Sequence, residues 1–146
     1  MNYSCSMQSQ ILYLLRDLNN QISPKFERCT GISQSRLALL SYLYKHGEIS
    51  QTILQKEINI DSAAITRHVK QLEAAGKVSR RKSTDDNRVT LVRLTDIGYE
   101  EVVSYKNERD SFVASMLKDF NEEELQILFY MLKRMQQNTS EIEEKS

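Results

Sequence analysis

The sequence contains few of the residues that interrupt or cross-link a fold. Its 146 residues include two cysteines, one proline and four glycines. Few prolines and glycines argue against long flexible linkers, so we expect a single domain over residues 1–146. Basic and acidic residues number 20 each, and the net charge is zero. Attraction to a charged partner must therefore come from local clusters of charge.

Motifs of enzymes, metal centres and membrane spans are also missing from the sequence. There is no Gly-rich phosphate loop, nucleophile elbow, Cys-x-x-Cys pair or metalloprotease helix. The two histidines, His46 and His68, lie in no cluster with ligand spacing, so we expect no metal, no cofactor and no enzymatic activity. No apolar stretch approaches the ~18 residues of a membrane span. An early apolar run is broken by Arg16 and Asp17, and we predict a cytoplasmic protein without a signal peptide.

An amphipathic helix is predicted between Asp61 and Gly76. Asp61 can cap its first turn, and Gly76 can end it in the left-handed conformation. Ile65, Val69 and Leu72 recur at i, i+4 and i+7, which predicts a buried face. The opposite face carries small, hydroxyl and basic side chains that suit a DNA groove: Ser62, Ala63, Thr66, Arg67 and Lys70.

Shorter elements are predicted on both sides of this helix. A short helix over residues 51–57 leaves Asn59-Ile60 as a tight connection, and two helices joined so closely predict a helix-turn-helix. After the second helix, strand-like residues 77–82 and 88–94 flank the turn-forming residues 83–87. This pattern predicts a β-hairpin.

The predicted helix and hairpin form a basic segment. From Arg67 to Arg93 there are eight basic and three acidic residues, a net charge of +5, whereas residues 119–146 hold three basic and seven acidic residues, a net charge of −4. Attraction between a protein charge and a DNA phosphate acts over roughly 8–10 Å. The local charge of a segment therefore matters more for DNA binding than the net charge of the chain. We expect Arg80, Arg81 and Lys82 to contact the DNA backbone and to make binding dependent on salt.

Three motifs in order resemble the MarR family of winged helix-turn-helix transcription regulators. The predicted helix ends in Leu72-Glu73-x-x-Gly76, the hairpin holds Asp86-x-Arg88, and Leu94-Thr95-x-x-Gly98 follows. The resemblance implies a mainly α fold with a small β-hairpin wing, in which residues 33–94 form the DNA-binding lobe and residues 7–30 and 95–139 form dimerisation helices. Lys77 departs from the pattern, because the family usually has an apolar residue after the glycine. We expect a weaker packing contact there.

The resemblance also implies a mode of DNA binding. A homodimer would place its two recognition helices in successive major grooves of a pseudo-palindromic operator in double-stranded DNA, with half-sites roughly 10–10.5 bp apart. Arg88 at the wing tip would enter the minor groove, and Asp86 would orient it through a salt bridge. Alternatively, Asp86 caps its own loop, and Arg67 and Lys70 are ordinary solvated charges.

The flanking helices carry more apolar residues than a small winged core can cover. Dimerisation would cover them, and the alternative is that Phe112, Met116, Leu125 and Leu128 fill the core of a monomer. Pro24 should kink the first helix unless a new helix starts there. Thr95 can cap the long helix that follows the hairpin. Asn121 and Glu124 resemble a capping box at the start of the last helix.

The sequence leaves the controlling signal open. Cys5 and Cys29 are the only cysteines, and either is a candidate redox sensor, although a small buried residue is the alternative for Cys29. The family also binds phenolic or aromatic compounds, and Tyr13, Arg16 and Tyr42 lie on helices that would line such a site, where packing is the alternative for the tyrosines.

We therefore interpret the chain as a sequence-specific DNA-binding regulator. It would be a repressor released by a small ligand or by cysteine modification. The alternative is a winged-helix protein-interaction module without its own operator.

Overall fold

The computed structural model describes residues 6–145. It divides into two compact units, Met1–Phe112 and Val113–Ser146. Cys5, one of the two candidate redox sensors, lies outside the described residues.

The first unit begins with α1 (Met7–Thr30), which Ser6 caps and Gly31 ends with a φ of 83°. Pro24 lies inside this helix, which excludes the alternative that a new helix starts there. A proline removes one backbone hydrogen bond, here to the carbonyl of Asn20. Asn20 is exposed, and water can satisfy that carbonyl without ending the helix.

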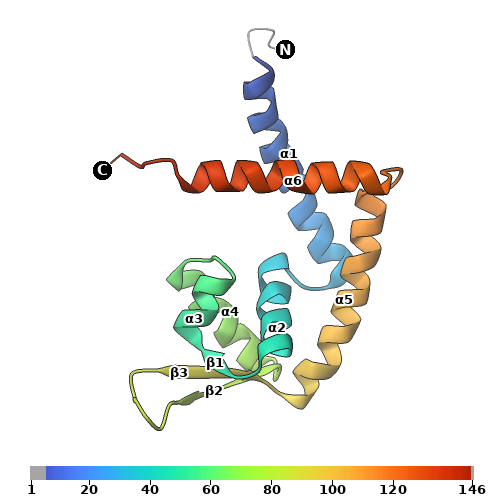
Figure 1. The fold of residues 1–146 in the computed structure, drawn as a ribbon. Coiled ribbons are helices and arrows are strands. Elements are labelled where there is room, and N and C mark those ends of the chain that lie inside the picture. Colours follow the sequence, from blue (N-terminus) through green and yellow to red (C-terminus); the bar gives the residue numbers. More distant parts are fainter. Residues whose placement is uncertain (1–5, 146) are drawn as a thin grey trace. The chain divides into compact units, whose positions relative to one another are not determined.

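The winged lobe follows in one continuous stretch of chain. It consists of α2 (Gln34–His46), β1 (Ile49–Ser50), α3 (Gln51–Glu57), α4 (Ser62–Ala74), β2 (Val78–Lys82) and β3 (Thr90–Leu94). The three strands form an antiparallel sheet in the order β1-β3-β2, from which the loop between β2 and β3 projects away from the helices (Figure 1). The hairpin was predicted, whereas the two-residue strand β1 was not.

The core of the lobe lies between these helices and the sheet. The predicted inner face of α4 is confirmed, since Ile65, Val69 and Leu72 are all buried. They pack in one cluster with buried side chains from the neighbouring elements: Leu39, Leu40 and Leu43 of α2, Leu54 of α3, and Val78, Val92 and Leu94 of the sheet. Burial of this apolar surface stabilises the lobe and fixes which side of α4 faces outward.

The long helix α5 (Asp96–Met116) starts beside the sheet, and Thr95 caps it by accepting from the amide of Gly98 at 3.1 Å, as predicted. Near the end of the first unit, Phe112 packs edge-on against Phe26 with ring centroids 5.4 Å apart. Of the four residues proposed to fill a monomer core, Phe112 therefore contributes to it. Met116 is exposed.

The second unit contains α6 (Glu122–Ser140). Its predicted capping box is present: Asn121 accepts from the amide of Glu124, whose carboxylate accepts from the amide of Asn121. None of the helix's residues is buried, and several large apolar side chains are exposed: Ile127, Phe129, Tyr130, Met131 and Leu132.

Candidate nucleic-acid interface

The outer face of α4 is the centre of the candidate interface. All five side chains predicted for it are exposed: Ser62, Ala63, Thr66, Arg67 and Lys70. Asp61 caps the helix by accepting from the amide of Ala64 at 2.7 Å. Thr66 donates to the carbonyl of Ser62 at 2.8 Å, which leaves its oxygen free to accept. Among the described residues, neither Arg67 nor Lys70 has an ion-pair partner, so both charges are available to an anion.

The turn before α4 sets the direction in which this face points. Asn59 has a φ of 54°, in the left-handed region that Asn tolerates better than most residues. The amide of Ile60 donates back to the carbonyl of Gln55 at 3.3 Å. The two helices of the predicted helix-turn-helix are thus joined by a hydrogen-bonded turn.

A polar contact that the sequence did not predict joins α4 to α2. Arg36 of α2 donates through Nε to Nδ1 of the half-buried His68 at 3.3 Å. Burial lowers the pKa of His68, and the nearby charges of Arg36 and Arg67 lower it further, while Asp61 raises it. His68 is therefore a packing residue that accepts a hydrogen bond as the neutral imidazole.

Two of the predicted backbone-contacting arginines are already paired within the chain. Arg80 donates to Glu73 of α4 at 2.7 Å, and Arg81 donates to Glu48 at 2.8 and 3.1 Å. The hydrogen bond from Arg81 is the main reason why the pKa of Glu48 is lowered. Lys82 contacts Thr90 across the hairpin at 3.2 Å. Binding of phosphate by Arg80 or Arg81 would thus compete with a carboxylate.

At the wing tip, Asp86 has both of the roles considered for it. Its carboxylate pairs with the guanidinium of Arg88 at 3.0 and 3.1 Å, and it also accepts from the backbone amide of Arg88 at 3.0 Å. These hydrogen bonds lower the pKa of Asp86. The side chain of Arg88 is 91% exposed, so Asp86 orients a guanidinium that otherwise projects into solvent.

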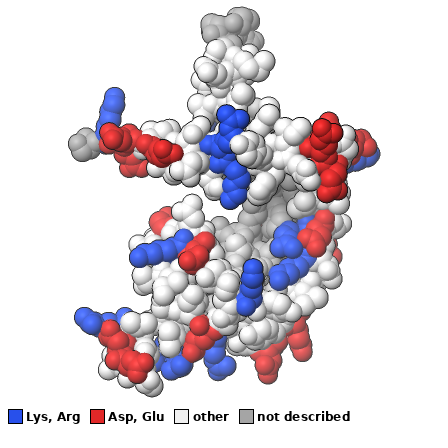
Figure 2. All heavy atoms as spheres, in the orientation of Figure 1, with Lys and Arg blue, Asp and Glu red and all other residues white. Residues whose placement is uncertain are grey.

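The basic segment does not form an uninterrupted positive surface. Figure 2 shows acidic side chains beside basic ones around the hairpin, at the lower left of the view. The pairs of Arg80, Arg81 and Arg88 with carboxylates account for this mixture. Within this segment, exposed positive charge without a carboxylate partner among residues 6–145 therefore lies at Arg67 and Lys70 of α4 and at Lys82 and Arg93 of the hairpin.

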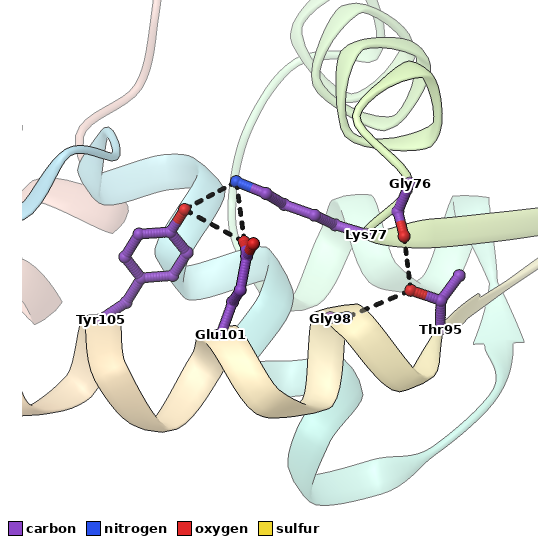
Figure 3. Close-up of polar contacts among 6 residues, drawn as sticks. All are labelled: Gly76, Lys77, Thr95, Gly98, Glu101 and Tyr105. Carbon is purple, nitrogen blue, oxygen red and sulfur yellow. Dashed lines mark hydrogen bonds and ion pairs between the residues drawn. The ribbon is translucent and has the colours of Figure 1, made fainter.

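The junction between α4 and the wing is bonded to the start of α5 (Figure 3). The amide of Thr95 donates to the carbonyl of Lys77 at 3.0 Å, and the Thr95 hydroxyl donates to the carbonyl of Gly76. A Cβ atom at Gly98 would lie 2.2 Å from the Lys77 carbonyl oxygen, so only glycine fits. The expectation that Lys77 weakens the packing here needs correction, because its side chain is largely buried and its ammonium is hydrogen-bonded to Tyr105 and Glu101.

The residues proposed for sensing lie on separate parts of the first unit. Tyr13 is exposed on α1 with the Arg16 guanidinium 5.3 Å from its ring centroid, and Arg16 also pairs with Asp17. Tyr42 packs instead against the core, with its ring 4.2 Å from that of His46. Cys29 is exposed, so its alternative interpretation as a buried residue is wrong. Its place near the end of α1 faces solvent rather than the core.

Within residues 6–145, no group of three or more His, Cys, Asp or Glu side chains is arranged to hold a metal ion. Over the same range, no helix has the length and apolar character of a membrane span.

Comparison with known proteins identifies the family. A model described as the MarR family matches residues 32–90, which cover the helix-turn-helix and most of the wing. The Bacillus subtilis (strain 168) protein described as the uncharacterized HTH-type transcriptional regulator YdgJ is 55% identical over 139 residues, which are 95% of this chain and 85% of that protein. The chain belongs to the MarR family. It is a MarR-family transcriptional regulator, as its sequence motifs predicted.

Solved MarR-like structures confirm the fold. A mutant of MarR from E. coli complexed with operator DNA has a TM-score of 0.78 and 21% identity, over 90% of this chain and 99% of that one. BpsR from Bordetella bronchiseptica, whose DNA binding is described as regulated by 6-hydroxynicotinic acid, also has a TM-score of 0.78, with 22% identity over 87% of this chain and 98% of that one. The mainly α winged helix-turn-helix architecture is thus confirmed.

Proposed function

We propose that this MarR-family regulator is a homodimeric repressor that binds a pseudo-palindromic operator. The observation that carries the proposal is the outer face of α4, where Arg67 and Lys70 are exposed and lack ion-pair partners among residues 6–145, beside a wing whose Arg88 is presented by Asp86. Two such faces in a dimer would enter successive major grooves, with half-sites roughly 10–10.5 bp apart. Ser62, Ala63 and Thr66 would meet base edges or phosphates.

Dimerisation is supported by the exposed apolar side chains of two helices. Phe129 and Tyr130 of α6 are 64% and 65% exposed, and Leu12 and Leu14 of α1 are exposed as well. Large apolar side chains exposed in such numbers on one helix mark an interface. We propose that residues 7–30 and 95–139 supply the dimer contacts, that residues 33–94 bind DNA, and that the protein is a single cytoplasmic domain.

The proposed release signal is a small aromatic or phenolic ligand. Its support is the aromatic acid named for BpsR, together with the exposed Tyr13 and Arg16 of α1, whereas Tyr42 of α2 packs against the core. Modification of the exposed Cys29 is the other proposed signal, because an accessible thiol can react. In either case the signal would favour an arrangement in which the two recognition helices no longer fit the operator.

Binding to the DNA upstream of the chain's own gene tests the proposal. The purified protein is titrated against that DNA and against a scrambled duplex of equal composition, at several salt concentrations. We expect saturable binding to one palindromic site, weakening steeply as salt rises because phosphate contacts release counterions. Equal and weak binding to both duplexes would contradict an operator at that position and would favour the interaction module.

A further inference from the structure

Three polar side chains form a closed set of contacts between the end of the recognition helix and α5. The ammonium of Lys77 lies 2.6 Å from the Tyr105 hydroxyl and 3.1 Å from Oε2 of Glu101. The Tyr105 hydroxyl in turn donates to the same Glu101 oxygen at 3.3 Å. We call Lys77, Glu101 and Tyr105 the junction cluster; Figure 3 shows all three side chains converging beside α5.

The ammonium of Lys77 forms its polar contacts within the protein. The side chain is only 19% exposed. Burial by itself would lower the pKa of Lys77, but the hydrogen bonds to Tyr105 and Glu101 outweigh burial, and the pKa is raised. Lys77 therefore stays protonated, and its ammonium is directed at α5, whereas Arg67 and Lys70 on the same helix-turn-helix segment face solvent.

The junction cluster provides a second attachment of the α4–β2 junction to α5. The first is the backbone contact of Thr95 with Gly76 and Lys77. Glu101 and Tyr105 lie six and ten residues further along α5, or about 9 and 15 Å at 1.5 Å per residue. These two residues flank Val102 of α5, which is buried in the same core as side chains of α4 and β2. An attachment this far along the helix restricts rotation of the junction about Thr95.

We propose that the junction cluster positions the recognition helix for DNA binding, so that the orientation of α4 follows that of α5. This inference rests on the proposed operator binding. Lys77 directly follows the turn that ends α4 and precedes β2, so the cluster acts on both parts that would meet DNA. Lys77, Glu101 and Tyr105 are positioning residues in this proposal, and none of them contacts DNA.

Substitution of Glu101 by Gln separates this role from ordinary electrostatics. Removing a carboxylate from a DNA-binding protein should tighten binding, because one repulsive charge is lost. If the cluster positions α4, Glu101→Gln should instead weaken operator binding by about three- to tenfold, a factor within the range for residues that act on a site from a distance. Glu100→Gln is the matched control, since Glu100 is the preceding residue of α5, is exposed and has no partner among residues 6–145. It should bind as tightly as the parent or slightly more tightly.

Lys77→Met tests the cluster from its other side. Methionine retains most of the side-chain volume of lysine but lacks the ammonium. The thermal midpoint of Lys77→Met should therefore stay close to that of the parent protein. Affinity should fall by a similar factor, while the dependence of log Kd on log salt stays that of the parent. A slope reduced by about one counterion would show that Lys77 binds a phosphate directly and would overturn the proposal.

Hydrogen exchange of the free protein tests the cluster without DNA. Peptides that contain the end of α4 and the start of β2 should exchange faster in Glu101→Gln and Lys77→Met than in the parent, and at the parental rate in Glu100→Gln. Unchanged exchange in both cluster variants would refute the proposal even if DNA binding fell. If the parent binds no operator but exchange changes as expected, the proposed function fails while the attachment to α5 stands.

Discussion

Arg36 donates a hydrogen bond to Nδ1 of His68, and this contact joins α2 to the inner side of the recognition helix. The bond requires an unprotonated Nδ1, because a protonated imidazolium has no acceptor. It also places His68 close to two positive charges, those of Arg36 and Arg67, with Asp61 as the opposing charge.

Stability should consequently depend on pH through His68. The pKa of His68 is lowered in the folded state, so below about pH 6.5 the unfolded chain binds a proton more readily than the folded one. This contribution to the free energy of unfolding should be fully present above that pH and should be lost as pH decreases through the folded pKa. Urea unfolding at pH 7.5 and 5.5 measures this. His68→Gln, which keeps an acceptor, should remove this contribution, and His46→Gln is the control that should leave it unchanged.

Arg88 and Asp86 should act together at the wing tip. Arg88→Ala should weaken operator binding by at least about fivefold and make its salt dependence shallower. Asp86→Asn keeps an oxygen for the loop but loses the ion pair, so it should also weaken binding despite the lost negative charge. Fluorescence anisotropy with a labelled operator gives both values. Asp85→Asn is the neighbouring control, and it should tighten binding because it only removes a negative charge. If Asp86→Asn also tightened binding, the orienting role of Asp86 would be excluded.

Glu48 should limit the contribution of Arg81 to DNA binding. Glu48→Gln removes the carboxylate that holds the Arg81 guanidinium, so affinity should rise by about two- to fivefold and the salt dependence should become steeper by about one counterion. The increase should be lost in the Arg81→Ala background. An equal increase in both backgrounds would mean that Glu48 acts only through its general charge.

Gly98 should not tolerate even alanine. Alanine normally stabilises a helix relative to glycine by about 1 kcal/mol. At this position the new Cβ would overlap the Lys77 carbonyl oxygen, so we expect a loss of ~1–3 kcal/mol in the free energy of unfolding instead. Ser104→Ala, at an exposed position of the same helix, should be neutral or stabilising. Urea unfolding of the two variants compares them directly, and a stabilised Gly98→Ala protein would contradict the close contact.

The exposed apolar face of α6 should be required for the dimer. Phe129→Asp introduces a charge that would be costly to bury at an interface, so sedimentation should show a shift from dimer toward monomer. Asn138→Asp changes an exposed polar residue on the opposite face of the same helix and should leave the dimer intact. A dimeric Phe129→Asp protein would place the interface elsewhere.

Local signals in the sequence predicted the elements of the lobe, and contacts between distant residues account for what it missed. The inner face of α4 followed from the spacing of its apolar residues, and Asp61 was recognised as a cap because capping is local. Strand β1 was missed because two residues carry no periodic pattern, and its pairing with β3 spans more than 40 residues. The pairs of Arg36 with His68 and of Arg81 with Glu48 join residues 32 and 33 positions apart.

Lys77 shows how a family pattern can mislead. The pattern expects an apolar side chain after Gly76, so the lysine was interpreted as a weaker packing residue. Its two partners lie in α5, and Tyr105 is 28 residues further along the chain. Whether a buried ammonium is satisfied depends on such distant partners, which only the folded chain brings together.

Ser50 takes part in two secondary-structure elements, the strand β1 and the N-terminal cap of α3. It pairs with Leu91 of β3 as the last residue of β1, and its side chain accepts from the amide of Ile53 as the cap of α3. An inserted residue at 49–51 would shift the strand register and remove the cap in a single event, whereas the loop at 83–89 is bonded mainly to itself and can change length. Divergence among related regulators should therefore alter the reach of the wing tip, while the base of the wing and the helix-turn-helix are inherited together.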